Sequence, residues 1–151
     1  MRRVTEIFGA KSRPYWTAPA PALGIPAPVV ELLQDEVNGD VRTVRLRMKS
    51  MRAAPELKLF AEGVEVLSAT MQGRSVLAAP KEDWLFSAYN LPAEGTELSM
   101  RVKAGRPFFV RVIDTTYGLP AVGLAARSPG MVMRPFGVTD SVRAFTSIGF
   151  N

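Results

Sequence analysis

The chain has 151 residues, of which 47% are hydrophobic and 22% are charged, and its formal net charge is +5. This length fits one domain, and the balance of apolar and charged residues excludes an intrinsically disordered chain. The chain contains neither cysteine nor histidine, which excludes disulfides, thiolate chemistry, histidine-based proton transfer and metal sites that need imidazole.

Residues 1–28 are expected to form a tail followed by a proline-rich strap, ahead of a domain at residues 29–151. The strap is predicted to run extended over the surface, because proline lacks a backbone donor and restricts the residue before it. Tyr15 and Trp16 are expected to pin it to the domain, and residues 1–12 to form either a short helix or a frayed tail. No signal peptide is expected, because no apolar stretch follows the basic start.

From residue 29 onward, short alternating segments are separated by turn signals. The clearest has Val44, Leu46 and Met48 alternating with charged residues, and this period of two is typical of a half-buried strand. Further strands are expected at residues 29–36, 56–61, 64–71, 75–79, 83–90, 96–103, 107–114 and 140–150. Turns are expected at Asn38-Gly39, at Gln72-Gly73 and at residues 92–95 and 104–106. About seven or eight close strands favour an all-β, antiparallel sandwich or barrel, and we expect an immunoglobulin- or fibronectin-like β-sandwich.

Residues 115–138 predict a long C-terminal loop that is rich in glycine and proline. Its large apolar residues include Met131, Met133 and Phe136. A loop of this length and apolar character is uncommon in a compact domain. Three interpretations stay open: an irregular lid over one end of the sandwich, a docking surface for a neighbouring domain or membrane face, and a ligand lid.

The acidic residues predict no catalytic or metal site. Asp114 is expected to end a strand and to cap the following turn, to which Gly118 and Pro120 also belong. Two acid pairs are expected to be solvated residues at a turn or a strand end, namely Asp35-Glu36 and Glu82-Asp83. The chain has neither an aspartate-rich calcium loop nor a glycine-rich phosphate loop, so no cofactor is expected.

Aromatic side chains suggest a binding or docking surface. Tyr15, Trp16 and Tyr117 are the candidates for stacking on a sugar or a peptide, together with the apolar residues of the C-terminal loop. The basic residues are spread along the chain, and those between residues 42 and 52 alternate as on a solvated strand face. Nucleic acid is therefore not an expected partner, and a basic face that binds anionic lipid or nucleic acid is kept as an alternative.

Two segments carry a family resemblance, residues 84–95 and residues 110–120. The second contains Asp114, two threonines and then Tyr-Gly-Leu-Pro ending at Pro120. Both look like the C-terminal region of bacterial membrane-anchored zinc peptidases of metallopeptidase family 28, which are similar to the endoplasmic-reticulum metallopeptidase and aminopeptidase group. Residues 15–21 and 28–35 fit the segment that leads into this C-terminal region of the family.

The resemblance implies a role without catalysis. In such proteins a zinc-bearing peptidase domain comes first, transmembrane helices follow, and a β-rich domain ends the chain outside the cytoplasm. None of the family's zinc ligands has a counterpart here. The resemblance therefore implies an accessory domain on the extracytoplasmic, periplasmic side of a membrane, in contact with the peptidase and transmembrane portions of its parent chain or with the membrane surface. The alternative is a stand-alone β-sandwich that binds a carbohydrate or a peptide.

Overall fold

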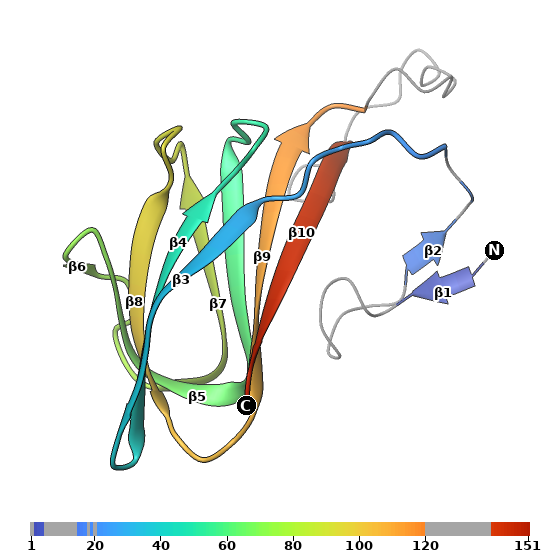
Figure 1. Cartoon of the computed structure of the whole chain (residues 1–151). Helices are drawn as coiled ribbons and strands as arrows, with labels where there is room; N and C mark the ends of the chain where they lie inside the picture. Colours follow the sequence, from blue (N-terminus) through green and yellow to red (C-terminus); the bar gives the residue numbers. More distant parts are fainter. Residues whose placement is uncertain (1, 5–14, 18, 20, 120–139) are drawn as a thin grey trace.

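The computed structural model describes residues 2–4, 15–17, 19, 21–119 and 140–151. These residues form strands, turns and extended segments without a helix, which confirms an all-β, antiparallel fold. The strands are β1 (Arg2–Val4), β2 (Tyr15–Thr17), β3 (Val29–Asn38), β4 (Val41–Lys49), β5 (Glu56–Met71), β6 (Arg74–Ser75), β7 (Lys81–Tyr89), β8 (Thr96–Lys103), β9 (Phe108–Tyr117) and β10 (Ser141–Phe150). β1 pairs with β2, and the other strands form one eight-stranded sheet (Figure 1).

The large sheet curls into a half-barrel because β5 bends. The hydrogen-bonded order is β10-β9-β5-β8-β4-β3, and β6 and β7 also pair with β5. Residues 56–62 of β5 pair with β9, whereas residues 66–71 pair with β8. The register of β5 against β7 shifts between Ala61 and Glu65, around Gly63, whose φ is 84°. Glycine accepts this left-handed backbone without a side-chain clash, so the strand can turn from one side of the half-barrel to the other.

Two walls are named below by their central strands. The β9 wall consists of β7, residues 56–62 of β5, β9 and β10, and the β4 wall consists of residues 66–71 of β5, β8, β4 and β3. Apolar side chains from the inner faces of both walls form one core. Its largest fully buried members are Phe108, Leu46, Met48, Leu59, Leu98, Met100, Val44, Val66, Val102, Val110 and Val112. The apolar residues of the alternating pattern that predicted the strands therefore also form the core.

Arg42 bridges the seam between the two ends of the curled sheet. Its guanidinium donates to both carboxylate oxygens of Asp35 at 2.7 Å and to the Asn151 carbonyl oxygen at 2.8 Å. It also lies 5.7 Å from the ring centroid of Phe108 and 5.3 Å from that of Phe150. The hydrogen bonds from Arg42 lower the pKa of Asp35 below its ordinary value.

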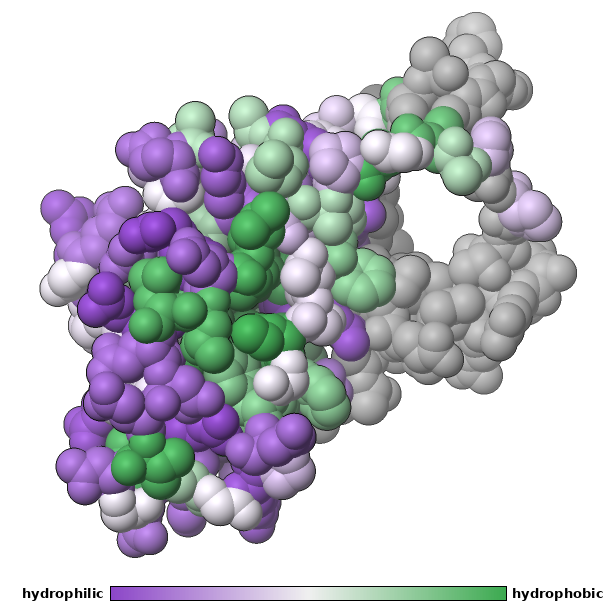
Figure 2. Space-filling model, viewed as in Figure 1, coloured by the Kyte–Doolittle hydropathy of each residue, from purple (hydrophilic) through white to green (hydrophobic). Residues whose placement is uncertain are grey.

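On the face seen in Figure 2, hydrophobic residues gather in the middle and hydrophilic residues lie around them, mainly toward β6 and β8.

The immunoglobulin- or fibronectin-like sandwich is not confirmed, because both walls belong to one hydrogen-bonded sheet. The strands expected at residues 56–61 and 64–71 are the single bent strand β5. Of the strand expected at residues 75–79, only Ser75 belongs to a strand, the two-residue β6 that pairs with β5. The first hairpin turns at Gly39 and Asp40, one position later than expected.

The N-terminal segment is partly described. Residues 2–4 form a strand and not a helix, because they pair with β2. Tyr15–Thr17 is extended, as expected for the strap. The division into a strap at residues 1–28 and a domain at residues 29–151 stays a prediction.

Candidate functional site

The outer face of the β9 wall carries a groove of 170 Å³ that combines apolar and basic side chains. Because side chains alternate between the two faces of a strand, the residues that line the groove point outward, whereas their neighbours along each strand face the core. The groove is lined by Lys58, Phe60, Leu85, Arg111, Ile113, Thr115 and Arg143. These residues come from β5, β7, β9 and β10, so the groove depends on the complete wall.

Strand register brings the lining residues together. Lys58 is opposite Ile113, and Phe60 is opposite Arg111 on one side and Leu85 on the other. Ile113 is only 6% exposed although it lies on the outer face, so it forms the floor of the groove. The phenyl and alkyl groups of the lining supply an apolar surface between basic side chains.

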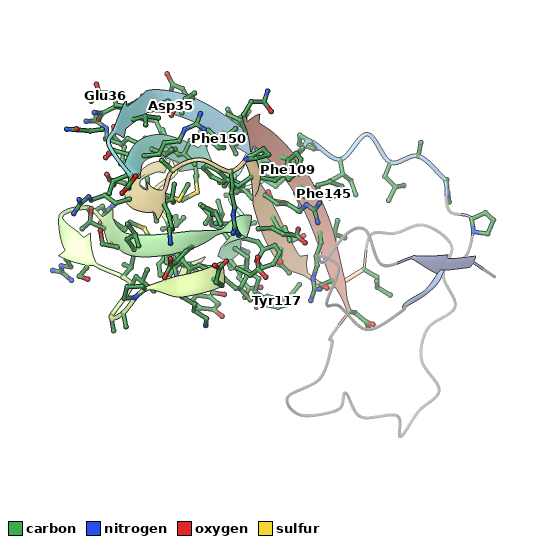
Figure 3. All side chains as sticks on the ribbon, turned by 90° about the horizontal axis from the view of Figure 1, so that it is seen from below. Asp35, Glu36, Phe109, Tyr117, Phe145 and Phe150 are labelled. Carbon is green, nitrogen blue, oxygen red and sulfur yellow. The ribbon has the colours of Figure 1, made fainter. Side chains whose placement is uncertain are left out.

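Exposed aromatic and aliphatic residues surround this groove. Their exposed fractions are 52% for Leu85, 60% for Tyr89, 59% for Phe109, 59% for Tyr117 and 43% for Phe145. In Figure 3, Phe109, Phe145 and Tyr117 follow one another along β9 and β10, whereas Phe150 lies nearer the interior. A concentration of exposed apolar side chains on one face is typical of an interaction surface.

Three of the seven lining residues are cationic and none is acidic. Lys58 Nζ lies 3.0 Å from Glu56 Oε1 beside the groove. The Arg111 guanidinium lies 5.5 Å from the ring centroid of Phe145, and its Nε donates to Ser147 Oγ at 3.3 Å. The contact with an aromatic ring holds a guanidinium close to an apolar surface. The lining therefore places cationic groups beside an apolar floor.

Glu56 connects the groove to Tyr89. The carboxylate is buried and accepts a hydrogen bond of 3.0 Å from the Tyr89 hydroxyl. Burial by itself raises the pKa of Glu56, but hydrogen bonding and attraction from Lys58, together with the hydrogen bond from Tyr89, lower it below its ordinary value of 4.5. Glu56 therefore stays ionised and holds Lys58 at the edge of the groove.

We expect a Tyr89→Phe variant to lose stability on acidification at a higher pH than the native chain. A lowered carboxyl pKa stabilises the fold above the ordinary value and loses that effect as pH falls through the folded value. Removing the Tyr89 hydroxyl moves the Glu56 pKa upward, so the difference between variant and native chain is largest above pH 4.5 and disappears at lower pH. Urea unfolding across this range measures it, with Tyr117→Phe on the same face as control. If the native chain and both variants lose stability at the same pH, the hydrogen bond from Tyr89 does not lower the pKa of Glu56.

Asp114 does not cap the turn that follows β9, which corrects the prediction. It lies within β9, opposite Ala144, and its side chain is fully buried. Ser50 Oγ donates to Asp114 Oδ2 at 2.6 Å, and the Arg52 guanidinium pairs with Asp114 Oδ1. Arg52 also donates to Thr116 Oγ1 at 3.1 Å. The carboxylate thus ties the segment between β4 and β5 to β9.

The acid pairs expected at a turn or a strand end lie within strands, near their ends. Asp35 and Glu36 belong to β3, and Asp35 is held by Arg42. Glu82 and Asp83 belong to β7, where Asp83 Oδ1 accepts from the backbone N–H of Gly63 at 2.9 Å. Sequence separation hid the contact between Asp83 and Gly63, which are 20 positions apart.

Among the aromatic candidates, the structure places Tyr117 on the same outer face as the groove. Gly118 lies at a bend with a φ of 94°, and its N–H donates to the Asp140 carbonyl oxygen at 2.9 Å. The side chains of Tyr15 and Trp16 lie outside the described part of the chain. So do Pro120, Met131, Met133 and Phe136.

Sequence patterning missed the basic members of the groove. One signal was available, because the outward positions of β9 include Phe109, Arg111 and Ile113 where a solvated strand would have polar residues throughout. The contribution of Arg143 depends on pairing between β9 and β10, which residues 118–140 separate in the chain, and no local pattern reveals that pairing.

Within the described residues, no group of three or more acidic side chains is placed to hold a metal ion. In the same part of the chain, no helix has the length and apolar character needed to span a bilayer. No protein-family model matches the chain, and the searches of curated proteins and of solved structures gave no significant match.

Proposed function

We propose that this chain is a non-catalytic interaction domain that docks through the outer face of its β9 wall. The observation that carries the proposal is the concentration of exposed apolar residues on that face, including Leu85, Phe109 and Phe145. Covering them with a partner removes apolar surface from water, which is the main favourable contribution to most protein association. The basic groove within the face adds a site for directional contacts.

The proposed partner is the peptidase and transmembrane portion of a membrane-bound zinc peptidase of metallopeptidase family 28. Support comes from where the resembling segments lie in the fold. Residues 84–95 include most of β7, and residues 110–120 include most of β9, so both contribute to the β9 wall. The proposal assigns zinc and peptide hydrolysis to the partner, and places this chain on the extracytoplasmic side of the membrane.

The finer architecture is part of the same proposal. We relate the curled sheet to an immunoglobulin- or fibronectin-like sandwich in which β5 takes part in both layers. Support comes from its antiparallel pairing with β9 in one half and with β8 in the other.

Photo-crosslinking from the docking face tests the function. A benzophenone amino acid is placed at position 109 or 145 of the chain expressed in its native cells, and crosslinked peptides are identified by mass spectrometry. We expect peptides of a zinc peptidase, because both native side chains are exposed phenylalanines on the β9 wall.

Position 37 is the matched control, since Val37 is 63% exposed on β3 and lies outside the β9 wall. Its yield of the same crosslinks is expected to be several-fold lower. Equal yields from position 37, or crosslinks confined to proteins of other classes, would refute the proposed partner.

A further inference from the structure

Strand β7 forms one edge of the β9 wall, because within the described residues it pairs only with β5. The Asn90 N–H donates to the Pro55 carbonyl oxygen at 3.0 Å, which extends the ladder between these two strands by one position. Successive residues of an antiparallel strand point their backbone groups alternately toward and away from a neighbouring strand. Because Asn90 points toward β5, the backbone N–H and C=O groups of Leu85, Ser87 and Tyr89 point toward the open edge.

Residues 84–89 of β7 lack the features that usually keep an edge strand from pairing with another chain. They contain neither a charged residue nor a proline, and they follow β5 without a register shift. In contrast, the edge strand β3 has a register shift and carries Asp35 on its inner face, opposite the buried Val44. The edge strand β10 is held at the seam, where the Thr146 hydroxyl donates to the Pro28 carbonyl oxygen at 2.5 Å. Among these edges, β7 is therefore the one best suited to accept a further strand.

We propose that two copies of this chain pair antiparallel through residues 84–89 of β7, with Ser87 of each copy on the two-fold axis. The inference goes beyond the proposed docking function, because the pairing uses the edge of the β9 wall and leaves the outer faces of β9 and β10 uncovered. The β9 walls of the two copies then form one continuous sheet, and both docking faces lie on the same side of it.

The side chains of β7 are complementary to their own copies in this register. A two-fold axis normal to the sheet places outward side chains opposite outward side chains. With Ser87 on the axis, Leu85 of each copy faces Tyr89 of the other, and these side chains are 52% and 60% exposed in the single chain. Such aromatic and aliphatic pairs stabilise neighbouring antiparallel strands. On the inner side of the sheet, the partly buried Phe86 faces the small Ala88.

The backbone groups and the charges fit the same arrangement. The two Ser87 residues exchange both of their hydrogen bonds, as do Leu85 of each copy and Tyr89 of the other, because all three residues point their backbone groups toward the open edge. No like charges oppose one another, since residues 84–89 carry no charge. A strand pair of this length buries less area than a standard protein interface, so we expect a weak dimer that dissociates on dilution.

Thiol crosslinking tests the pairing and its register, because the chain contains no cysteine. Opposite residues of a hydrogen-bonded antiparallel pair have Cα atoms about 5.5 Å apart. Ser87→Cys in the complete chain is therefore expected to give a covalent dimer with a bifunctional thiol reagent that has a short spacer. Leu85→Cys alone is expected to give several-fold less, because its counterpart lies about 14 Å away along the strand. An equal mixture of Leu85→Cys and Tyr89→Cys is expected to restore the yield as a mixed dimer.

Sedimentation velocity over a range of concentrations tests the dimer without a covalent link. Leu85→Lys is expected to raise its dissociation constant roughly tenfold, because lysine on an edge strand opposes pairing. Val37→Lys is the matched control on the edge strand β3, where Val37 is 63% exposed, and it is expected to leave the dissociation constant unchanged. Ser87→Pro is expected to abolish the dimer and to keep the native circular dichroism, because it removes an N–H of the open edge and no bond to β5.

Four outcomes overturn the inference. They are a native chain that sediments as a monomer at millimolar concentration, equal crosslinking from Ser87→Cys and Leu85→Cys, equal effects of Leu85→Lys and Val37→Lys, and a dimer that Phe109→Lys weakens but Leu85→Lys does not. The last result would place the contact between copies on the outer face of β9 instead of on the edge of β7.

Discussion

Replacing Asp114 with alanine is expected to lower the free energy of unfolding by about 3–5 kcal/mol, because removing one partner of a buried ion pair leaves the other charge uncompensated. The Asp114 side chain is fully buried, and that of Arg52 is 12% exposed. The substitution also deprives Ser50 Oγ of its 2.6 Å acceptor. Urea unfolding at pH 7, monitored by tryptophan fluorescence and circular dichroism, measures the loss.

The exposed pair between Glu31 and Arg47, 3.2 Å apart with side chains 55% and 46% exposed, supplies the control. Glu31→Ala is expected to change stability by less than about 1 kcal/mol. The double substitution of Arg52 and Asp114 by alanine is expected to cost less than the sum of the single substitutions, because both remove the same pair. An Asp114→Ala chain as stable as Glu31→Ala would show that this pair does not anchor β9.

Replacing Phe108 with alanine is expected to cost about 3–5 kcal/mol, the range typical of removing a buried aromatic side chain. Phe108 is 1% exposed, and its ring stacks on that of Phe150 with centroids 4.6 Å apart. The substitution opens a cavity where β9 meets β10 and removes one of the two rings beneath the Arg42 guanidinium. Thermal and denaturant unfolding both report the loss.

Phe109 is the matched control, because it is adjacent in β9 but 59% exposed. Phe109→Ala is expected to change stability by roughly 0.5 kcal/mol or less, as is usual for exposed positions. If the two variants were equally unstable, the assignment of inner and outer faces of β9 would be wrong, and with it the position of the groove.

Much of the fold was predictable because strands such as β4 and β8 alternate buried and less buried residues with a period of two. Residues 96–103 match β8 at both ends, and the Gln72-Gly73 turn lies where expected, between Met71 and Arg74. The bend in β5 was not predictable in this way. Glu62 and Gly63 resemble a turn between two strands, but pairing with β9, β7 and β8 keeps the chain extended on both sides of them.

The candidate site was far less accessible from sequence than the fold. Tyr117 was selected because an exposed aromatic side chain can stack on a sugar or a peptide, and it does lie exposed on the outer face. The groove itself joins Lys58, Arg111 and Arg143, which lie far apart in the chain and meet only through strand register. Asp114 was assigned to a turn because Gly118 and Pro120 follow it, whereas its partner Arg52 lies 62 positions away. Local sequence patterns reveal neither the register between distant strands nor the partner of a buried charge.

The bent strand β5 also determines how the molecule comes apart. It supplies backbone hydrogen bonds to β7, β8 and β9, so loosening either wall removes partners from the strand that supports the other. Such a chain unfolds as one cooperative unit, and because its contacts are mostly non-local, folding in milliseconds to seconds is the natural range. A partner bound to one wall therefore stabilises both by mass action, and it protects the amide hydrogens of both walls from exchange with solvent.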